Sequence, residues 1–287
     1  MYFRLGYTES TLLFIHFLEK FHLHDLDKSI LQNYKQQYIN WLYTTSGFYD
    51  TTIKGTNFDF NMEFDSIQKS STYCQYFDLL LEFVSQNRFN YLEIHIHTLS
   101  LLDNKFTYLF YQYIHFDPNS YYDWKSFMST NIHQSNCLII SNLGHLMCDQ
   151  YNNGNLNNIH NMVLNITSLH YYKPGYTFEN NKLKSADALN MLDNSYHHWG
   201  LIKQIIYNKH INFIIISAGA YSFIYAYFCK LHNIQFITIG GDLEVFFGIN
   251  TKRTSIFYNK IINKYFINVP ETDKPQNYKE IEGGCYW

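Results

Sequence analysis

The clearest hydrophobic pattern in the chain lies between residues 211 and 248. Asn212 to Ile216 is a continuous apolar, mostly β-branched run, which predicts a central parallel strand covered on both faces. Tyr221 to Leu231 is an apolar segment of helical length, and Gln235 to Ile239 is a second strand-like run. A strand, a crossover helix and a second strand in this order predict an α/β fold with a parallel sheet.

Shorter patterns of the same kinds occupy the rest of the chain. Strands are predicted at residues 1–5, 92–97, 137–140 and 165–169, and helices at 12–21, 32–43, 73–84, 122–129, 147–151 and 195–207. Thr8 and Glu9 are cap-type residues before the first helix, whereas residues 51–71 and the tail after Thr251 are irregular. The pattern predicts a Rossmann-like, mainly parallel sheet flanked by helices.

Two domain organisations fit this pattern. In one, residues 1–130 form a helical and α/β half that completes the site, and residues 131–287 form a nucleotide-binding half with an irregular tail. In the other, the chain is one continuous domain, for which 287 residues suffice.

Composition narrows the function classes. The formal net charge is -3 and the chain has no long basic run, which argues against a non-specific nucleic-acid binder. Its five cysteines form no CxxC pair, so a disulfide framework or structural zinc site is disfavoured and reduced thiols in the cytoplasm are favoured. AT-rich codons explain the 27 tyrosines and 24 phenylalanines, so single aromatic residues carry little functional weight.

The most membrane-like stretch runs from Phe213 to Cys229. Ser217, Gly219 and Ser222 interrupt it, and another strand-like run follows it. A buried strand, turn and helix explain the stretch better than a membrane span, which needs about 20 apolar residues. We therefore expect no membrane span.

The turn after the first strand of the 211–248 segment is the leading candidate for a ligand site. Ligands of open parallel sheets bind outside the carboxyl ends of the strands, where Ser217-Ala-Gly-Ala220 falls. Small residues let the backbone approach a ligand, and the helix beginning at Tyr221 offers N–H groups to a phosphate. Ser217 and Ser222 add hydroxyl groups. Alternatively, Gly219 only allows close packing of strand and helix.

A second turn, Gly240-Gly241-Asp242-Leu-Glu244, follows the next strand and lies beside the first in a parallel sheet. Asp242 and Glu244 could coordinate a divalent ion, Mn or Mg, that bridges a pyrophosphate, or one of them could bind a ribose hydroxyl. A helix start whose positive end favours acidic side chains explains the same residues equally well.

Other candidate sites have weaker support in the sequence. Glu93, His95 and His97 share one face of a predicted strand, but the pattern supplies no further metal ligand, so solvated or hydrogen-bonded side chains explain them better. The dinucleotide fingerprint G-x-G-x-x-G is absent, as are the hydrolase motifs G-x-S-x-G and H-E-x-x-H.

Several short segments, spread over nearly the whole chain, resemble a group of bacterial and giant-virus proteins. That group carries a GAYG-type turn, a GG-x-x-Q-x-x-FGI segment and a terminal EGGCYW, and it is similar to GT-D-type glycosyltransferases, which open with R-F-G-D-G-E. The matching segments here are Arg4 to Glu9, Ser46 to Tyr49, Ser217 to Ser222, Gly240 to Ile249 and Glu282 to Trp287. The resemblance implies a Rossmann-like fold, a nucleotide-diphosphate sugar as donor, and a glycan or protein-linked sugar as acceptor.

The resemblance also implies roles for individual residues. The amino-terminal site motif is Arg4, Gly6 and Glu9; the nucleotide turn is Ser217, Gly219, Ala220, Tyr221 and Ser222; and the adjacent loop is Gly240, Gly241 and Glu244. The sequence departs from the pattern at four positions. Tyr7 replaces the motif aspartate, Ser222 the second glycine of the turn, Asp242 a small residue and Glu244 a glutamine.

These residues suit glycosyl transfer. Arg4 could stabilise the leaving phosphate, and Glu9, or else Asp242, could deprotonate the acceptor hydroxyl. Three alternatives remain open: a non-catalytic nucleotide- or sugar-binding protein, an S-adenosylmethionine-dependent methyltransferase with Asp242 at the ribose, and a structural ion pair between Arg4 and Glu9. The terminal Cys285-Tyr-Trp287 is predicted to pack back against the core or the site.

Overall fold

The computed structural model describes residues 2–21, 71–87, 89, 91–94, 104–116, 123–161, 164–175, 190–219, 221–275, 278–280, 284, 286 and 287. Several sequence predictions lie outside these residues. They are the helix at 32–43, nearly all of the irregular region 51–71, the segment Ser46 to Tyr49, the residues His95 and His97, and Ala220 of the first turn.

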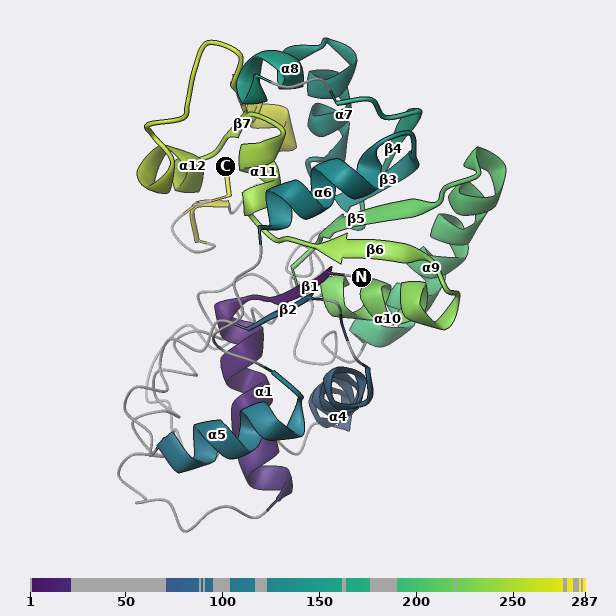
Figure 1. The fold of residues 1–287 in the computed structure, drawn as a ribbon, viewed down its shortest axis with the longest axis vertical. Helices are drawn as coiled ribbons and strands as arrows, with labels where there is room; N and C mark the ends of the chain where they lie inside the picture. Colours follow the sequence, from purple (N-terminus) through teal and green to yellow (C-terminus); the bar gives the residue numbers. More distant parts are fainter. Residues whose placement is uncertain are drawn as a thin grey trace.

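A six-stranded parallel sheet forms the centre of the molecule (Figure 1). The strand order is β2-β1-β6-β5-β3-β4, and the bounds are β1 (Tyr2–Leu5), β2 (Tyr91–Ile94), β3 (Asn136–Ser141), β4 (Ser168–Tyr172), β5 (Phe213–Ser217) and β6 (Gln235–Thr238). All pairings in this sheet are parallel. The predicted α/β, Rossmann-like class is therefore confirmed.

Helices follow most strands. They are α1 (Tyr7–Lys20), α4 (Ser71–Gln86), α5 (Asn104–Tyr113), α6 (Trp124–Ile132), α7 (Gly144–Asn152), α8 (Asn155–His160), α9 (Asn190–Lys209), α10 (Tyr221–Leu231), α11 (Asp242–Phe246) and α12 (Lys252–Phe257). The 3-10 turns η4 (Glu271–Asp273) and η5 (Tyr278–Glu280) lie near the end of the chain. Among the described helices, none is both long and apolar enough to cross a membrane.

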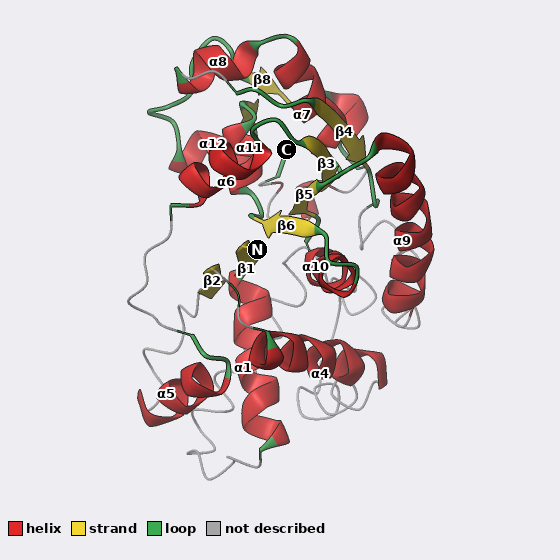
Figure 2. Cartoon of the chain, turned by 45° about the vertical axis from the view of Figure 1, so that its right-hand side comes forward, coloured by secondary structure: helices red, strands yellow, loops and turns green. Residues whose placement is uncertain are grey.

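The two faces of the sheet bury separate cores. Leu138 and Ile140 of β3 point into one core, together with side chains from α1, α4, α5, α9 and α10. Cys137 and Ile139 point into the other, with side chains from α6, α7, α8 and α11. Figure 2 shows the sheet between these helical layers. Because successive strand residues alternate between two buried faces, the strand has to be apolar throughout, as its sequence is.

The structure moves the start of two predicted elements. The first helix begins at Tyr7, earlier than its apolar pattern indicated, so Thr8 and Glu9 lie in its first turn. Strand β4 begins at Ser168, three residues after the predicted start, because the Tyr151 hydroxyl binds the N–H and C=O groups of Ile166 just before it.

The tail after Thr251 is not irregular. The side chain of Thr251 accepts a hydrogen bond from the N–H of Thr254 and so caps α12. A small parallel sheet joins β7 (Ile249–Asn250) to β8 (Ile267–Asn268). Trp287 is buried in the second core, which confirms that the terminal aromatic packs back onto the domain.

Candidate functional site

The strand order reverses its direction between β3 and β5. Strand β3 leads through α7 to β4 on one side, whereas β5 leads through α10 to β6 on the other side. Helices α7 and α10 also lie on opposite faces, because their side chains belong to different cores. Open parallel sheets bind ligands outside the carboxyl ends of the strands at such a reversal. Ser141 and Ser217 are register partners at this point.

The first predicted turn leaves the sheet at this carboxyl edge. The Ser217 hydroxyl donates a hydrogen bond of 3.0 Å to the carbonyl oxygen of Gly240, which joins the first turn to the second. The Ser222 hydroxyl accepts a 2.9 Å hydrogen bond from the N–H of Ala218. Gly219 is exposed and has a φ of 55°, a left-handed conformation that favours glycine. The two serine hydroxyls therefore shape the turn.

The side chain of Tyr221 points into the protein and not toward a ligand at the edge of the sheet. It is buried in the first core, and its ring stacks on that of Tyr225 with 5.8 Å between centroids. Any contact of Tyr221 with a ligand would therefore involve its backbone at the start of α10.

The backbone of the second turn lies close to two ionisable side chains. A Cβ atom on Gly241 would lie 2.8 Å from Nη1 of Arg253 and 3.2 Å from Oε2 of Glu244. The Arg253 guanidinium thus lies directly against the turn, although the sequence reading did not select this residue. Gly240, with a φ of 67°, has open space around its missing side chain.

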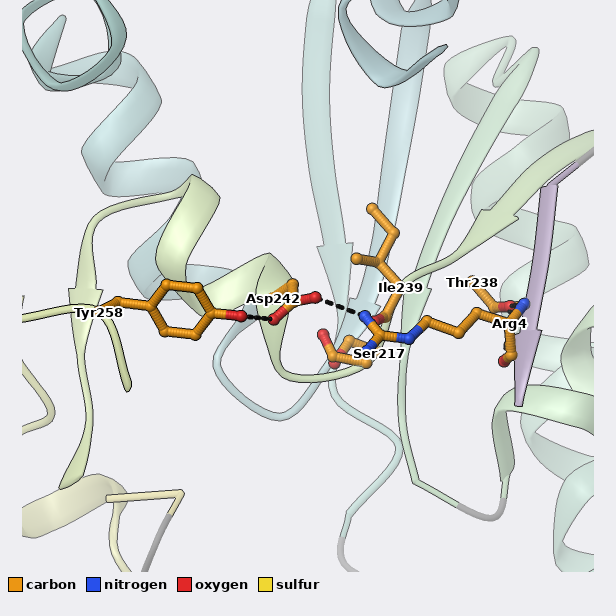
Figure 3. A network of polar contacts seen from close by, with 7 residues as sticks. Arg4, Ser217, Thr238, Ile239, Asp242 and Tyr258 are labelled. Atoms are coloured by element: carbon orange, nitrogen blue, oxygen red, sulfur yellow. Dashed lines mark hydrogen bonds and ion pairs between the residues drawn. The ribbon is translucent and has the colours of Figure 1, made fainter. Parts of the chain in front are cut away.

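Arg4 connects β1 to the second turn. Its backbone N–H donates to Oγ1 of Thr238 at 2.7 Å, and its guanidinium Nη1 donates to the carbonyl oxygen of Ile239 at 3.0 Å. The same Nη1 forms an ion pair of 2.5 Å with Oδ2 of Asp242 (Figure 3). The Arg4 side chain is only 15% exposed. The ion pair with Asp242 therefore makes Arg4 part of a half-buried network.

Tyr258 holds the other oxygen of Asp242. Its hydroxyl donates to Oδ1 at 2.6 Å, as Figure 3 shows. Burial, followed by the hydrogen bond to Asp242, raises the pKa of Tyr258 to about 12. Both carboxylate oxygens of Asp242 are thus engaged by protein groups. Sequence reasoning missed Tyr258 because it lies outside the matched segments and one tyrosine among many gives no signal.

Glu244 is buried two residues after Asp242, in the same first turn of α11. Burial raises the pKa of the Glu244 carboxyl to about 8, the negative charge of Asp242 adds to the rise, and the Arg253 guanidinium opposes it. At neutral pH the carboxyl is therefore mainly protonated. It would have to lose this proton before it could bind a metal ion.

The spacing of R-x-G-x-x-E has a structural explanation. A Cβ atom on Gly6 would lie only 2.3 Å from Oε2 of Glu9, so the Glu9 carboxylate lies against the Gly6 backbone. Glu9 is in the first turn of α1, where the positive end of the helix dipole favours a carboxylate. Gly6 thus makes room for Glu9, and Arg4 lies two residues earlier at the end of β1.

No family model matches this chain, and no curated protein or solved structure matches it either. The site therefore has to be judged on its own geometry.

The structure brings the predicted residues together in pairs. Ser217 contacts Gly240, and Arg4 contacts Asp242.

The described part of the chain contains no group of three or more His, Cys, Asp or Glu side chains that could hold a metal ion. Asp242 and Glu244, the predicted metal candidates, lie close enough for Asp242 to affect the pKa of Glu244. Glu93 is the register partner of Arg4 on the neighbouring strand β2. His95 and His97 lie outside the described residues.

Proposed function

We propose that this protein is a glycosyltransferase that uses a nucleotide-diphosphate sugar as donor and a glycan or protein-linked sugar as acceptor. One observation carries the proposal. Arg4 of the amino-terminal motif reaches the second turn, and Ser217 joins that turn to the first, so three segments of the resemblance meet at one edge of the sheet. This edge is where parallel sheets bind their ligands.

The proposed reaction transfers the sugar carbon between two oxygen atoms. The bond between that carbon and the leaving phosphate oxygen breaks, and its electron pair stays on the phosphate. The acceptor oxygen forms the new bond and loses its proton. The backbone at the start of α10 and the turn at Ser217 would bind the pyrophosphate, and the positive charge of Arg4 would favour its release.

Glu9 is the proposed general base. It is half-buried in the first turn of α1, directly after β1, and a carboxylate is a suitable proton acceptor for a hydroxyl. Asp242, the second candidate, binds Arg4 and Tyr258 with its two oxygens. In this proposal its main role is to orient the Arg4 guanidinium.

We also propose a cytoplasmic location and, because the resembled group includes giant-virus proteins as well as bacterial ones, a viral protein in the host cytoplasm. Cys137, Cys148 and Cys229 are free and buried, which suits a reducing compartment. Whether a divalent Mn or Mg ion binds the donor pyrophosphate is left to the experiment below. Asp242 and Glu244 are the residues that would hold such an ion.

A thermal-shift panel tests the donor. The protein is heated with UDP-, GDP- and CMP-sugars and with S-adenosylmethionine, each with and without manganese. We expect one class of sugar nucleotide to raise the melting temperature, because a ligand of the folded state stabilises it. No shift with any nucleotide would refute the proposal, and a shift with S-adenosylmethionine alone would favour a methyltransferase.

The substitution Glu9→Gln tests the base. It should abolish sugar transfer and leave the affinity for the donor nearly unchanged, whereas Glu82→Gln, on the exposed side of α4, should change neither. Loss of donor affinity would instead assign Glu9 to binding. Donor binding by the unsubstituted protein without any transfer or donor hydrolysis would favour a non-catalytic sugar-nucleotide-binding protein.

A further inference from the structure

An exposed apolar and basic surface lies on α12 and the turn that follows it. Ile256, Phe257 and Ile261 have exposed fractions of 58%, 72% and 45%. Thr254 of the same helix is buried, so α12 packs through one side and presents its other side to solvent. The N–H of Ile261 donates a hydrogen bond to the carbonyl oxygen of Tyr258. This turn keeps Ile261 close to the end of α12.

The charged residues within this segment all have the same sign. Lys252, Lys260 and Lys264 are exposed, and Arg253 lies in the same segment. The chain contains no Asp or Glu between Val245 and Pro270. We call the three exposed apolar side chains and the three lysines the 252–264 surface. Figure 1 shows α12 at the rim of its layer, on the outer side of α11.

We propose that the 252–264 surface docks on an anionic lipid bilayer, with Ile256, Phe257 and Ile261 entering the interface and the lysines contacting lipid headgroups. Peripheral membrane segments combine these two features, exposed apolar side chains and flanking cations. The proposal requires no membrane span, and it does not depend on the proposed transferase activity.

Two other classes of partner fit the surface less well. Protein interfaces are depleted of lysine relative to the rest of the surface, whereas three exposed lysines lie in the same segment as these apolar side chains. Single-stranded nucleic acid is bound by stacking bases on aromatic rings, and two of the three exposed apolar residues here are isoleucines. Insertion into lipid uses aliphatic and aromatic side chains alike.

The surface adjoins the candidate site. Tyr258 follows Phe257 directly, and its hydroxyl binds Asp242. A protein docked through α12 would therefore hold the second turn near the lipid headgroups. Acceptors at the membrane surface would be favoured over acceptors free in solution if the proposed function also holds.

Vesicle co-sedimentation of the full chain tests the proposal. The two vesicle types are phosphatidylcholine alone and phosphatidylcholine with about 30% phosphatidylserine. We expect binding to the anionic vesicles only, weakened when salt is raised from about 0.1 M to about 0.5 M, because salt screens the lysine contribution. No binding to anionic vesicles, or equal binding to both types, would overturn the proposal.

Variants separate the contribution of the lysine charges to vesicle binding from that of the apolar side chains. Lys260→Gln and Lys264→Gln should each weaken binding to anionic vesicles about fivefold. Phe257→Ser should weaken it by about tenfold or more, because a large apolar side chain is removed from the interface. Circular dichroism at each step confirms that the variants are folded.

Matched controls come from α9, which also has an exposed aromatic residue and an exposed lysine. Tyr207 is 82% exposed, and Lys209 is exposed at the end of the same helix. Tyr207→Ser and Lys209→Gln should leave vesicle binding unchanged. Binding that survives the three substitutions in the 252–264 surface, or that falls equally with the α9 controls, would show that this surface does not dock on lipid.

Discussion

The buried carboxyl of Glu244 should make the stability of the protein depend on pH in an unusual direction. Folding raises the pKa of Glu244 from its ordinary value of 4.5 to about 8, mainly through burial. Between these two values the folded protein keeps the proton and the unfolded chain loses it. The unfolded state then binds fewer protons, so the free energy of unfolding falls as pH rises through this window.

The magnitude follows from the size of the shift. One pKa unit corresponds to about 1.4 kcal/mol, so the shift of Glu244 amounts to about 5 kcal/mol across the window. Glu244→Gln keeps the shape of the side chain and cannot ionise. Relative to the unsubstituted protein, the variant should be similar in stability near pH 5 and more stable by up to about this amount near pH 8.5.

Urea denaturation at about pH 5, 6, 7 and 8.5 measures this difference, with the slope of the transition checked at each pH. Glu271→Gln is the control, because the Glu271 side chain is 79% exposed. The difference in unfolding free energy between Glu271→Gln and the unsubstituted protein should not show the change with pH that is predicted for Glu244→Gln. A Glu244→Gln difference that stays constant over the range, within about 0.5 kcal/mol, would refute the reasoning and mean that Glu244 is ionised beside Arg253.

Two further predictions concern the turn after α11 and the Asp242 network. Gly248→Ala should cost about 2–5 kcal/mol of unfolding free energy, because its φ is 68° and a Cβ would lie 2.2 Å from Ile159, whereas Gly154→Ala, with a φ of 70° and open space, should cost only about 1–2 kcal/mol. Equal losses in urea denaturation would show that the contact at Gly248 is relieved without cost. Tyr258→Phe should cost about 1–2 kcal/mol, because Asp242 loses a charged hydrogen bond at a half-buried position. An unchanged unfolding midpoint would mean that water replaces the hydroxyl.

Much of the fold could be predicted because its signals are local. Every residue from Phe213 to Ile216 is apolar, so a strand buried on two faces is the simplest explanation, and β5 (Phe213–Ser217) includes all four of them. The bounds of α10 also match the prediction. The short helix α11 was considered only as one of two explanations of Asp242 and Glu244, because five residues are too few to show a helical period.

The site was harder to predict because its contacts join distant segments. Asp242 was selected from the turn that contains it, but its two partners come from β1 and from the residue after α12. Arg4 was found through a motif, whereas Tyr258 and Arg253 lie outside any recognised segment. The close approach of the Arg253 guanidinium to Gly241 depends on how the two segments pack. No pattern in the local sequence predicts it.

The position of β1 in the sheet has a consequence for how the chain folds. Strand β1 lies between β2 and β6, and Tyr2 is the register partner of Ile237. The centre of the sheet cannot be completed until β6 has left the ribosome, so β1 has an unpaired edge during most of synthesis. Such long-range pairing slows folding and exposes an edge to other chains. We expect refolding from urea to be slow and to lose yield as protein concentration rises.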